Sequence, residues 1–293
     1  MQLSNTNFTD RLYLAYFTAL TIAIVILRQR VPGWTSFVAL NAMVITSILA
    51  LVHFSRRWPH AHAWYPLLLP IIAFPEAAQL RDLLVDEWRD PYLLAIEAAV
   101  FAEPPTVWLG RFRSMLFSEI VQAGYLSYFL FLPVVAGVLY LRQGKSAFFA
   151  VMAATVLGYL ACYVIFLVFP TEGPAHTLRH LHTQPVPAGP LRSAVEFLQK
   201  AGTHGNAFPS AHAVGAVVPV IFAWHHAKKL ATWLLPLLVL MCVGAVYDRY
   251  HYASDMIGGI IIGVAAATFV TLVQSRPRWA KALNVCPLLS GSR

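Results

Sequence analysis

The chain has 293 residues, of which 58% are hydrophobic and only 12% are charged, with a formal net charge of +8. The charged share is about half that of ordinary globular proteins, which argues against a soluble domain and predicts an integral membrane protein. The basic residues stand in short clusters between apolar runs, so the positive charge fits membrane topology rather than nucleic-acid binding.

Apolar runs follow one another along the whole chain and predict an all-α bundle of about eight membrane-spanning helices. These runs cover residues 12–27, 34–54, 64–84, 115–141, 147–169, 208–224, 230–247 and 253–273. The first run lacks a basic leader and a cleavage site, so we interpret it as a retained anchor. The third is interrupted by Pro66, Pro70 and Pro75. Without it, the N-terminus would lie on the other side of the membrane.

The segment between the third and fourth runs, residues 90–113, is too short and too charged to span a membrane. Its apolar part, residues 91–101, predicts a helix that lies in the membrane interface. We therefore divide the chain into accessory helices with the interfacial helix (1–114), a functional core (115–275) and a cytoplasmic tail (276–293).

The charges of the loops distinguish the two sides of the membrane. Eleven of the 21 lysines and arginines lie on the side that holds both termini, together with only one of the 13 acids, Asp10. The positive-inside rule therefore places both termini in the cytoplasm. The long loop 170–207 then faces the periplasm, a lumen or the exterior, and the lack of a retention signal favours a bacterial inner membrane.

Three short polar stretches lie on the side opposite to the termini. They are Phe-Pro-Thr at 169–171, Pro-Ser-Ala-His at 209–212, and the segment 249–255 between the seventh and eighth runs. In the second stretch, Ser210 is expected to cap a helix start that directs free N–H groups and the positive dipole end towards an anion such as phosphate. His212 falls in the first turn of that helix.

His251 and Asp255 form the main candidate pair for catalysis. Being four residues apart, they are expected to share one helix face. The carboxylate then accepts a hydrogen bond from one imidazole nitrogen and leaves the other basic, as a nucleophile or base requires. Each histidine alone would be interpreted as an interfacial side chain, but the joint spacing with Ser210 favours catalysis. Arg249 offers a guanidinium fork for phosphate oxygens.

These spacings resemble the type 2 phosphatidic acid phosphatase (PAP2) superfamily of membrane enzymes. Residues 209–212 are similar to its Pro-Ser-Gly-His motif, and residues 251–255 to its final His-x-x-x-Asp motif. The Phe-Pro-Thr stretch is most similar to the inositol phosphorylceramide synthase branch. The specific likeness covers about residues 169–259, and it implies a PAP2-like catalytic core within the all-α bundle.

The resemblance implies a role for each of these residues. His251 would be the nucleophile that forms a phosphohistidine, with Asp255 orienting it and His212 protonating the leaving oxygen. Ser210, Ala211 and nearby backbone N–H groups would hold the phosphoryl oxygens. The implied scheme requires no metal and no other cofactor.

The chain departs from the family pattern in the residues that would hold the phosphate. The usual first motif, a lysine followed seven residues later by Arg-Pro, is absent, and Ala211 replaces a glycine. Ala245 stands where many members have an arginine, which makes Arg249 the substitute candidate. Arg179 and Arg192 in the long loop are further candidates for the phosphate contact.

Several other polar residues and glycines have alternative interpretations. Arg249 can also pair with a neighbouring acid or a lipid headgroup. Glu119 and Gln122 in the fourth run either line a substrate cavity or pair within the bundle. Gly259 and Gly263 form a Gly-x-x-x-Gly pattern that is typical of close helix packing.

The histidines of the long loop and the cysteines are interpreted as residues without a chemical role. The histidines of the long loop lack a metal-ligand spacing borne on a helix, so we expect them to be solvated; they are His176, His180, His182 and His204. The cysteines are far apart and are expected to pack in the bundle; they are Cys162, Cys242 and Cys286.

The sequence thus predicts a membrane phosphatase or phosphotransferase, surrounded by membrane lipids, that acts on a phosphorylated lipid at the extracytoplasmic face. Water as the acceptor gives a phosphatase, whereas inositol or a lipid alcohol gives a transferase. The alternative from another class is a lipid transporter or lipid-binding protein without catalysis. The polar residues Glu76, Gln79 and Arg81 in the broken third run would fit such a transport path.

Overall fold

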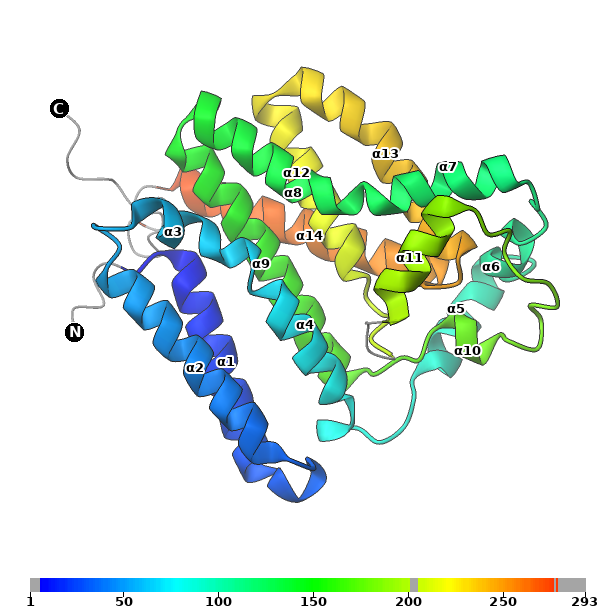
Figure 1. The fold of residues 1–293 in the computed structure, drawn as a ribbon, viewed down its shortest axis with the longest axis horizontal. Helices are drawn as coiled ribbons and strands as arrows, with labels where there is room; N and C mark the ends of the chain where they lie inside the picture. The colour runs from blue at the N-terminus through cyan, green and yellow to red at the C-terminus, as the bar shows by residue number, and fades with distance from the viewer. Residues whose placement is uncertain (1–5, 201–204, 277, 279–293) are drawn as a thin grey trace.

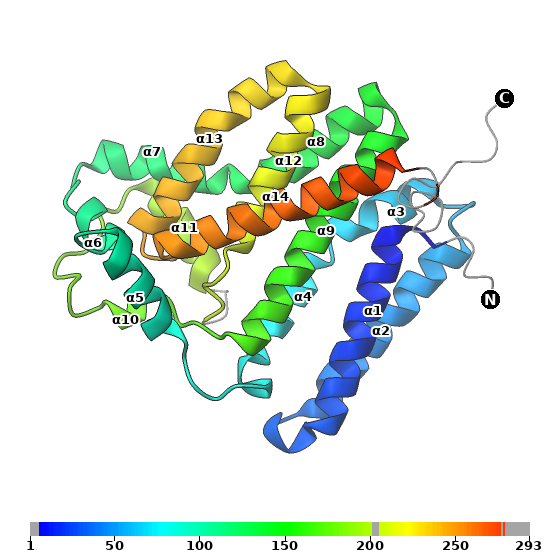
Figure 2. The same cartoon turned by 180° about the vertical axis from the view of Figure 1, so that it is seen from behind.

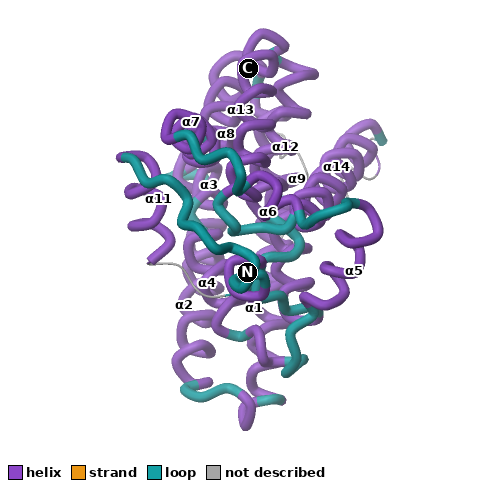
Figure 3. Tube along the Cα trace, turned by 90° about the vertical axis from the view of Figure 1, so that its right-hand side faces the viewer, coloured by secondary structure: helices purple, strands orange, loops and turns teal. Residues whose placement is uncertain are grey.

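The computed structural model describes residues 6–200, 205–276 and 278, and their regular elements are all helices or helical turns (Figure 1). Figure 3 shows the same part of the chain as helices and loops without a strand. The prediction of an all-α membrane protein is confirmed. Helices of at least 18 residues that are apolar enough to cross a membrane are α1 (Phe8–Ile26), α2 (Trp34–His53), α9 (Lys145–Val168), α13 (Lys228–Tyr247) and α14 (Ala253–Ser275).

The fourth predicted run forms a bent pair of helices that would make a sixth span. These helices are α7 (Met115–Leu126) and α8 (Tyr128–Val138), and a π-helical turn (Leu139–Gln143) follows them. The two helices meet at a bend of 41°, and Ser127 is the residue between them. The Ser127 hydroxyl donates a hydrogen bond to the carbonyl of Gly124 at 2.6 Å. Serine side chains that bond the backbone of the preceding turn favour such bends.

Two of the predicted spans, the third and the sixth, form helices shorter than 18 residues. The third run is divided by its prolines, which lack the N–H that a continuous helix needs. Its elements are α3 (Pro59–Trp64), a 3-10 turn (Tyr65–Leu67), α4 (Pro70–Gln79) and a second 3-10 turn (Arg81–Leu83). The sixth run forms α12 (Ala211–His226), whose 16 residues rise about 24 Å. The described residues therefore hold five long apolar helices, or six spans when the bent pair is included.

Four short helices gather at one end of the molecule (Figure 1). One of them, α5, forms where the interfacial helix was predicted. The group comprises α5 (Asp90–Val100), α6 (Pro105–Leu109), α10 (Pro174–Thr177) and α11 (Pro190–Lys200). The start of α1 and the end of α14 lie together at the opposite end (Figure 2). The predicted tail 276–293 lies outside the described residues, apart from positions 276 and 278.

Helix α9 occupies the centre of the core, since 72% of its most apolar 18-residue stretch is buried. It packs against α12 and α14 of the C-terminal half and against α1 and α4 of the N-terminal half. Helices α1 and α2 pack against each other as a hairpin (Figure 2), and a 3-10 turn (Arg28–Arg30) lies at its tip. This arrangement joins the accessory helices to the core through one central helix.

Close packing between α12 and α14 depends on two glycines. A Cβ atom on Gly259 would lie 2.2 Å from the carbonyl oxygen of Ser210, and one on Gly263 would lie 2.4 Å from Cγ1 of Val217. The expected role of this glycine pair in helix packing is confirmed. The contact also fixes the start of α12, because the Ser210 N–H donates to the carbonyl of Asp255 at 3.0 Å.

We expect Gly259→Val to destabilise the protein by about 1–3 kcal/mol, because its side chain would overlap the Ser210 backbone. Thermal unfolding of the purified protein in detergent measures the effect. Gly137→Val in α8 is the matched control, since a Cβ there meets nothing within 4 Å. Equal unfolding temperatures for the two variants would show that the contact between α12 and α14 is not this tight.

Candidate active site

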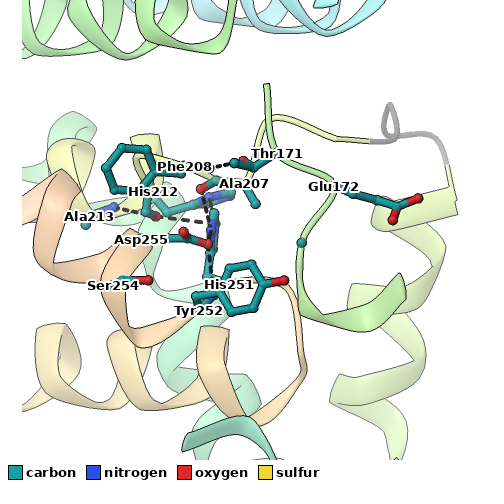
Figure 4. Close-up of polar contacts among 12 residues, drawn as sticks. Thr171, Glu172, Ala207, Phe208, His212, Ala213, His251, Tyr252, Ser254 and Asp255 are labelled. Atoms are coloured by element: carbon teal, nitrogen blue, oxygen red, sulfur yellow. Dashed lines mark hydrogen bonds and ion pairs between the residues drawn. The ribbon is translucent and has the colours of Figure 1, made fainter. Parts of the chain in front are cut away.

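Two helix starts and the turn between α13 and α14 bring four predicted residues together, three of which, His212, His251 and Asp255, are labelled in Figure 4. Ser210 caps α12, and its Oγ accepts a hydrogen bond from the N–H of Ala213 at 3.3 Å. His212 is the second residue of that helix, and His251 lies in the turn that precedes α14. Asp255 follows in the first turn of α14. The structure therefore places the candidate nucleophile, its acid, the second histidine and the serine in one cluster.

Both ring nitrogens of His251 have neighbours, and these neighbours identify the tautomer. Nδ1 lies 2.9 Å from the carbonyl oxygen of Ala207 and 3.3 Å from Oδ2 of Asp255. Both atoms accept hydrogen bonds, so Nδ1 carries the hydrogen and Nε2 keeps its lone pair. Nε2 faces Oγ of Ser210 and Nδ1 of His212, each 3.3 Å away. The basic nitrogen of the site is therefore Nε2.

The environment of His251 keeps its ring neutral. His251 is only 6% exposed. Burial lowers the pKa of His251 to about 4, although the hydrogen bond to the Ala207 carbonyl acts in the opposite direction. At pH 7 the imidazole is uncharged, and the lone pair of Nε2 is available for attack.

Asp255 reaches His251 from a helix cap rather than along a helix face. Helix α14 begins at Ala253, so the expectation that the pair shares one helix face is wrong. Oδ2 of Asp255 accepts a hydrogen bond from the Tyr252 N–H at 2.8 Å. A carboxylate in the first turn that bonds the preceding backbone turns back towards the residues before the helix. The predicted contact with His251 thus arises from capping geometry.

His212 lies on the other side of His251 and is held by two tyrosines. The hydroxyl of Tyr125 is 3.2 Å from Nε2 of His212. The ring of Tyr128 packs edge-on, with its centroid 4.7 Å from that of His212. These contacts hold the His212 ring beside His251, with Nδ1 of His212 3.3 Å from Nε2 of His251.

The segment after α9 holds the carbonyl that His251 uses. Thr171 is fully buried, and its Oγ1 accepts a hydrogen bond from the Phe208 N–H at 2.8 Å. Its carbonyl accepts a second bond from the Ala207 N–H at 3.4 Å. Figure 4 shows Thr171 beside this short stretch, on the far side from Asp255. The Phe-Pro-Thr stretch therefore acts on the site through the Ala207 backbone.

Asp90 of α5 holds two parts of the site together and was not identified as a site residue from sequence. Its Oδ1 accepts hydrogen bonds from the Gly173 N–H at 2.8 Å and from the Tyr252 hydroxyl at 3.0 Å. Oδ2 accepts a third bond from the Glu172 N–H at 2.7 Å. This buried carboxylate thereby joins the loop after α9 to the residue that follows His251.

Glu97, which lies seven residues further along α5 than Asp90, binds the start of α14. Its Oε1 accepts a hydrogen bond from the Ser254 N–H at 3.1 Å. Burial raises the pKa of Glu97, and the backbone hydrogen bonds from Ser254 and Ala253 oppose that rise. Asp90 and Glu97 are seven residues apart, which places them on one face of a helix. Two acids at this spacing in an apolar helix are the sequence signal for this brace.

We expect Asp90→Asn to destabilise the protein by about 1–3 kcal/mol, because an amide cannot accept all three of these hydrogen bonds and leaves a buried N–H unpaired. Thermal unfolding and turnover are measured on the same sample. Asp86→Asn is the control, because the Asp86 side chain is 78% exposed. If Asp90→Asn unfolds with the control and turns over substrate equally well, Asp90 does not brace the site.

The Arg192 side chain lies near the ring of Tyr250, the residue that precedes His251. Its guanidinium bonds the carboxylate of Asp248 and, through Nε, Glu196 at 2.9 Å. It also lies 5.7 Å from the ring centroid of Tyr250. Burial raises the pKa of Asp248 to about 6, while the Arg192 charge and Gln122 act in the opposite direction. Arg192 keeps further N–H donors beyond these two contacts.

The other two predicted phosphate-binding arginines show no contact that leads to the histidines among the described residues. The Arg249 guanidinium donates to the carbonyl of Gln184 at 2.6 Å, and the Arg179 side chain is exposed. Asp248, the acid next to Arg249, pairs with Arg192 instead. Among the described residues, none of the three predicted arginines is hydrogen-bonded to the two histidines. Arg249 also has φ +65°, an uncommon conformation for a side-chain-bearing residue.

Glu119 and Gln122 of α7 pair within the bundle, which was one of their two interpretations. The carboxylate of Glu119 accepts hydrogen bonds from the N–H groups of Leu191 at 3.0 Å and Arg192 at 3.2 Å, and so caps the start of α11. The Gln122 amide donates to Asp248. Together with Tyr125, these residues form one polar face of α7 that holds α11 and the turn after α13.

The histidines of the long loop do not join this cluster where the structure describes them. His176 and His180 are exposed. Nε2 of His182 lies 3.3 Å from Oγ1 of Thr106. His204 lies outside the described residues.

Comparison with known proteins gives one family match. The family is described as the PAP2 superfamily, and its model matches residues 92–269, more than half of the chain. The matched range includes Ser210, His212, His251 and Asp255. No curated protein and no solved structure matches the chain.

Proposed function

The chain belongs to the PAP2 superfamily, and on this premise we propose that it is a membrane phosphatase or phosphotransferase that forms a phosphohistidine at His251. The observation that carries the proposal is the unprotonated Nε2 of His251. Nδ1 is committed to Ala207 and Asp255, while Nε2 faces Ser210 and His212. A neutral imidazole oriented by an acid is the arrangement of an activated nucleophile.

In the first step, Nε2 of His251 forms a bond to the phosphorus of a phosphate ester. The bond from phosphorus to the ester oxygen breaks, and His212 in its protonated form, which the negative charge of the bound phosphate favours, gives its proton to that oxygen. The ring of His251 gains positive charge, which the carboxylate of Asp255 stabilises. In the second step, an acceptor hydroxyl loses its proton to His212 and attacks the phosphorus, and the P–N bond breaks.

The start of α12 supports the binding of the phosphoryl oxygens. Ser210 precedes this helix, and the positive end of the helix dipole lies at the N–H groups of Ala211 and His212. Helix starts of this kind bind phosphate without a metal ion. Arg192, linked to the site through Tyr250, is the proposed source of further positive charge, and Arg249 and Arg179 remain weaker candidates because their contacts lead elsewhere.

The proposed substrate is a phosphorylated lipid whose tails lie among the membrane helices. The proposed location of the site is the extracytoplasmic face, as the loop charges predict. We favour water as the acceptor, and hence a phosphatase, because no acceptor site is recognisable in the sequence. A transferase of the inositol phosphorylceramide synthase type, with inositol or a lipid alcohol as the acceptor, is the second candidate, favoured by the Phe-Pro-Thr stretch.

Turnover of a lipid phosphate by the purified protein tests this proposal. We expect release of inorganic phosphate by the wild type and loss of release in His251→Ala and His212→Ala. Equal turnover in all three proteins would reject the enzymatic mechanism proposed here, and no release by the wild type would favour the lipid transporter. Adding inositol or a lipid alcohol to the same assay separates the two activities, since a transferase converts the acceptor into a phosphorylated product.

A further inference from the structure

Tyr125 of α7 contacts the second histidine of the catalytic cluster through its hydroxyl. The Tyr125 hydroxyl lies 3.2 Å from Nε2 of His212, and Nδ1 of the same imidazole lies 3.3 Å from Nε2 of His251. The two nitrogens of His212 therefore have different neighbours. Nδ1 faces the nitrogen that would carry the phosphoryl group, whereas Nε2 faces a tyrosine from another helix.

Close packing between α7 and α13 fixes the position of Tyr125. A Cβ atom on Gly124 would lie 2.4 Å from Cβ of Leu240, and one on Gly244 would lie 3.4 Å from Cβ of Tyr125 itself. Tyr125 is only 3% exposed, and its ring centroid lies 5.3 Å from that of Tyr250. Packing of this density leaves the side chain little freedom. The hydroxyl is therefore held in place beside the second histidine.

Tyr128, on the other side of the bend in this helix pair, contacts His212 with its ring instead. Its hydroxyl lies 2.9 Å from the hydroxyl of Tyr159 in α9. The two tyrosines thus confine the imidazole of His212 between them, and Tyr125 supplies the hydroxyl that reaches Nε2.

The unprotonated Nε2 of His251 determines where the neutral His212 ring carries its hydrogen. A lone pair on Nδ1 of His212 would face the lone pair of that nitrogen, so Nδ1 carries the hydrogen and Nε2 of His212 accepts from the Tyr125 hydroxyl. In the protonated ring both nitrogens carry hydrogen, and the Tyr125 oxygen accepts from the Nε2–H instead. A hydroxyl can act in both ways because it is a donor and an acceptor. Nε2 of His212 therefore keeps its partner in both states.

We propose that Tyr125 is a positioning residue that makes Nδ1 the nitrogen through which His212 passes its proton, an inference that rests on the proposed phosphoryl transfer. As the bond from phosphorus to the ester oxygen breaks, the proton on Nδ1 moves to that oxygen, and the hydrogen that remains on Nε2 stays bonded to Tyr125. In the second step, the acceptor hydroxyl gives its proton to Nδ1 while it attacks the phosphorus. Without the Tyr125 hydroxyl, the protonated ring loses the partner of its Nε2–H, which is costly for a charged donor away from water.

Tyr125→Phe tests this role, because it removes the hydroxyl and keeps the ring. We expect kcat for a lipid phosphate to fall by roughly 10–100-fold with a nearly constant KM, since a hydrogen bond to a charged ring is lost. Tyr140→Phe is the matched control. The Tyr140 hydroxyl lies 2.8 Å from Nδ1 of His60, a contact between a tyrosine and a histidine outside the catalytic cluster. This variant should keep the turnover of the wild type, and unfolding temperatures of both variants report on the fold.

Nitrogen-15 NMR of the whole protein, labelled at its histidines, reports on the His212 ring directly. The signals of this ring are identified by their loss in His212→Ala. At neutral pH we expect the wild type to carry the hydrogen on Nδ1 and the lone pair on Nε2. The Nε2 signal should shift in Tyr125→Phe, because its hydrogen bond is lost, and should stay in place in Tyr140→Phe.

Three results would overturn the proposal. They are a hydrogen on Nε2 of His212 in the neutral wild-type ring, a folded Tyr125→Phe protein with the kcat of the wild type, and a loss that falls on KM alone, which would assign Tyr125 to substrate binding. If Tyr125→Phe does not fold, the position of the hydrogen in the wild type decides. Failure of the proposed function gives a different result, because His212→Ala would then keep the turnover of the wild type or the wild type would release no phosphate.

Discussion

His251→Ala is expected to lower the turnover of a lipid phosphate by on the order of 10⁴-fold or more, the scale seen when a covalent nucleophile is removed. The substitution removes Nε2, the unprotonated nitrogen that faces Ser210 and His212, so no phosphohistidine can form at this position. Steady-state release of inorganic phosphate in detergent micelles measures the loss. The expected change falls on kcat, because the imidazole reacts with the phosphate rather than holding the lipid.

The control for this variant is His225→Ala, which removes an exposed histidine at the other end of α12. It should keep the turnover of the wild type. Unfolding temperatures of both variants show whether either substitution acts through the fold. A folded His251→Ala protein that keeps a tenth or more of the wild-type rate would exclude His251 as the nucleophile.

Asp255→Asn is expected to lower kcat by roughly 10²–10⁴-fold, less than the loss for His251→Ala. The substitution removes the negative charge that stabilises the positively charged ring after attack. It does not remove every acceptor for Nδ1, because the Ala207 carbonyl lies 2.9 Å away, closer than the Asp255 oxygen at 3.3 Å. The remaining carbonyl contact preserves much of the tautomer preference, which is why the loss should be the smaller of the two.

The effect of Asp255→Asn is checked by measuring kcat and KM together. A fall in kcat with a nearly constant KM indicates a group that acts in the transition state. Glu87→Gln, at a side chain that is 82% exposed, provides the control. An unchanged kcat in a folded Asp255→Asn protein would show that the carboxylate serves only as the cap of α14.

The parts of the fold that sequence predicted best depend on local patterns. Long apolar runs identified α1, α2, α9, α13 and α14, because span length and composition are properties of one segment. The Ser210 cap and the glycine pair of α14 were recognised for the same reason. The bend at Ser127 and the breaks at the prolines of the third run each depend on single residues. Such residues hardly change the apolar pattern of a run, so the pattern alone does not predict where the helix bends or breaks.

The site was predicted in part, and the missing contacts join distant segments. Spacing linked His251 to Asp255, but it suggested a helix face, whereas the actual contact comes from a cap at the start of α14. Asp90 lies 162 residues from Tyr252 in the chain, and only the packing of α5 brings the two together. Arg192 was one of several candidates until its contacts with Asp248 and Tyr250 distinguished it.

Trapping the covalent intermediate tests the central proposal most directly. The protein is mixed with a lipid phosphate labelled in its phosphoryl group, quenched within the first turnover, and digested under alkaline conditions, in which phosphohistidine survives. We expect the label on the peptide that contains His251, attached through Nε2, and its absence from His251→Ala. Label on another residue, or full turnover without label on His251, would contradict the proposed phosphohistidine mechanism.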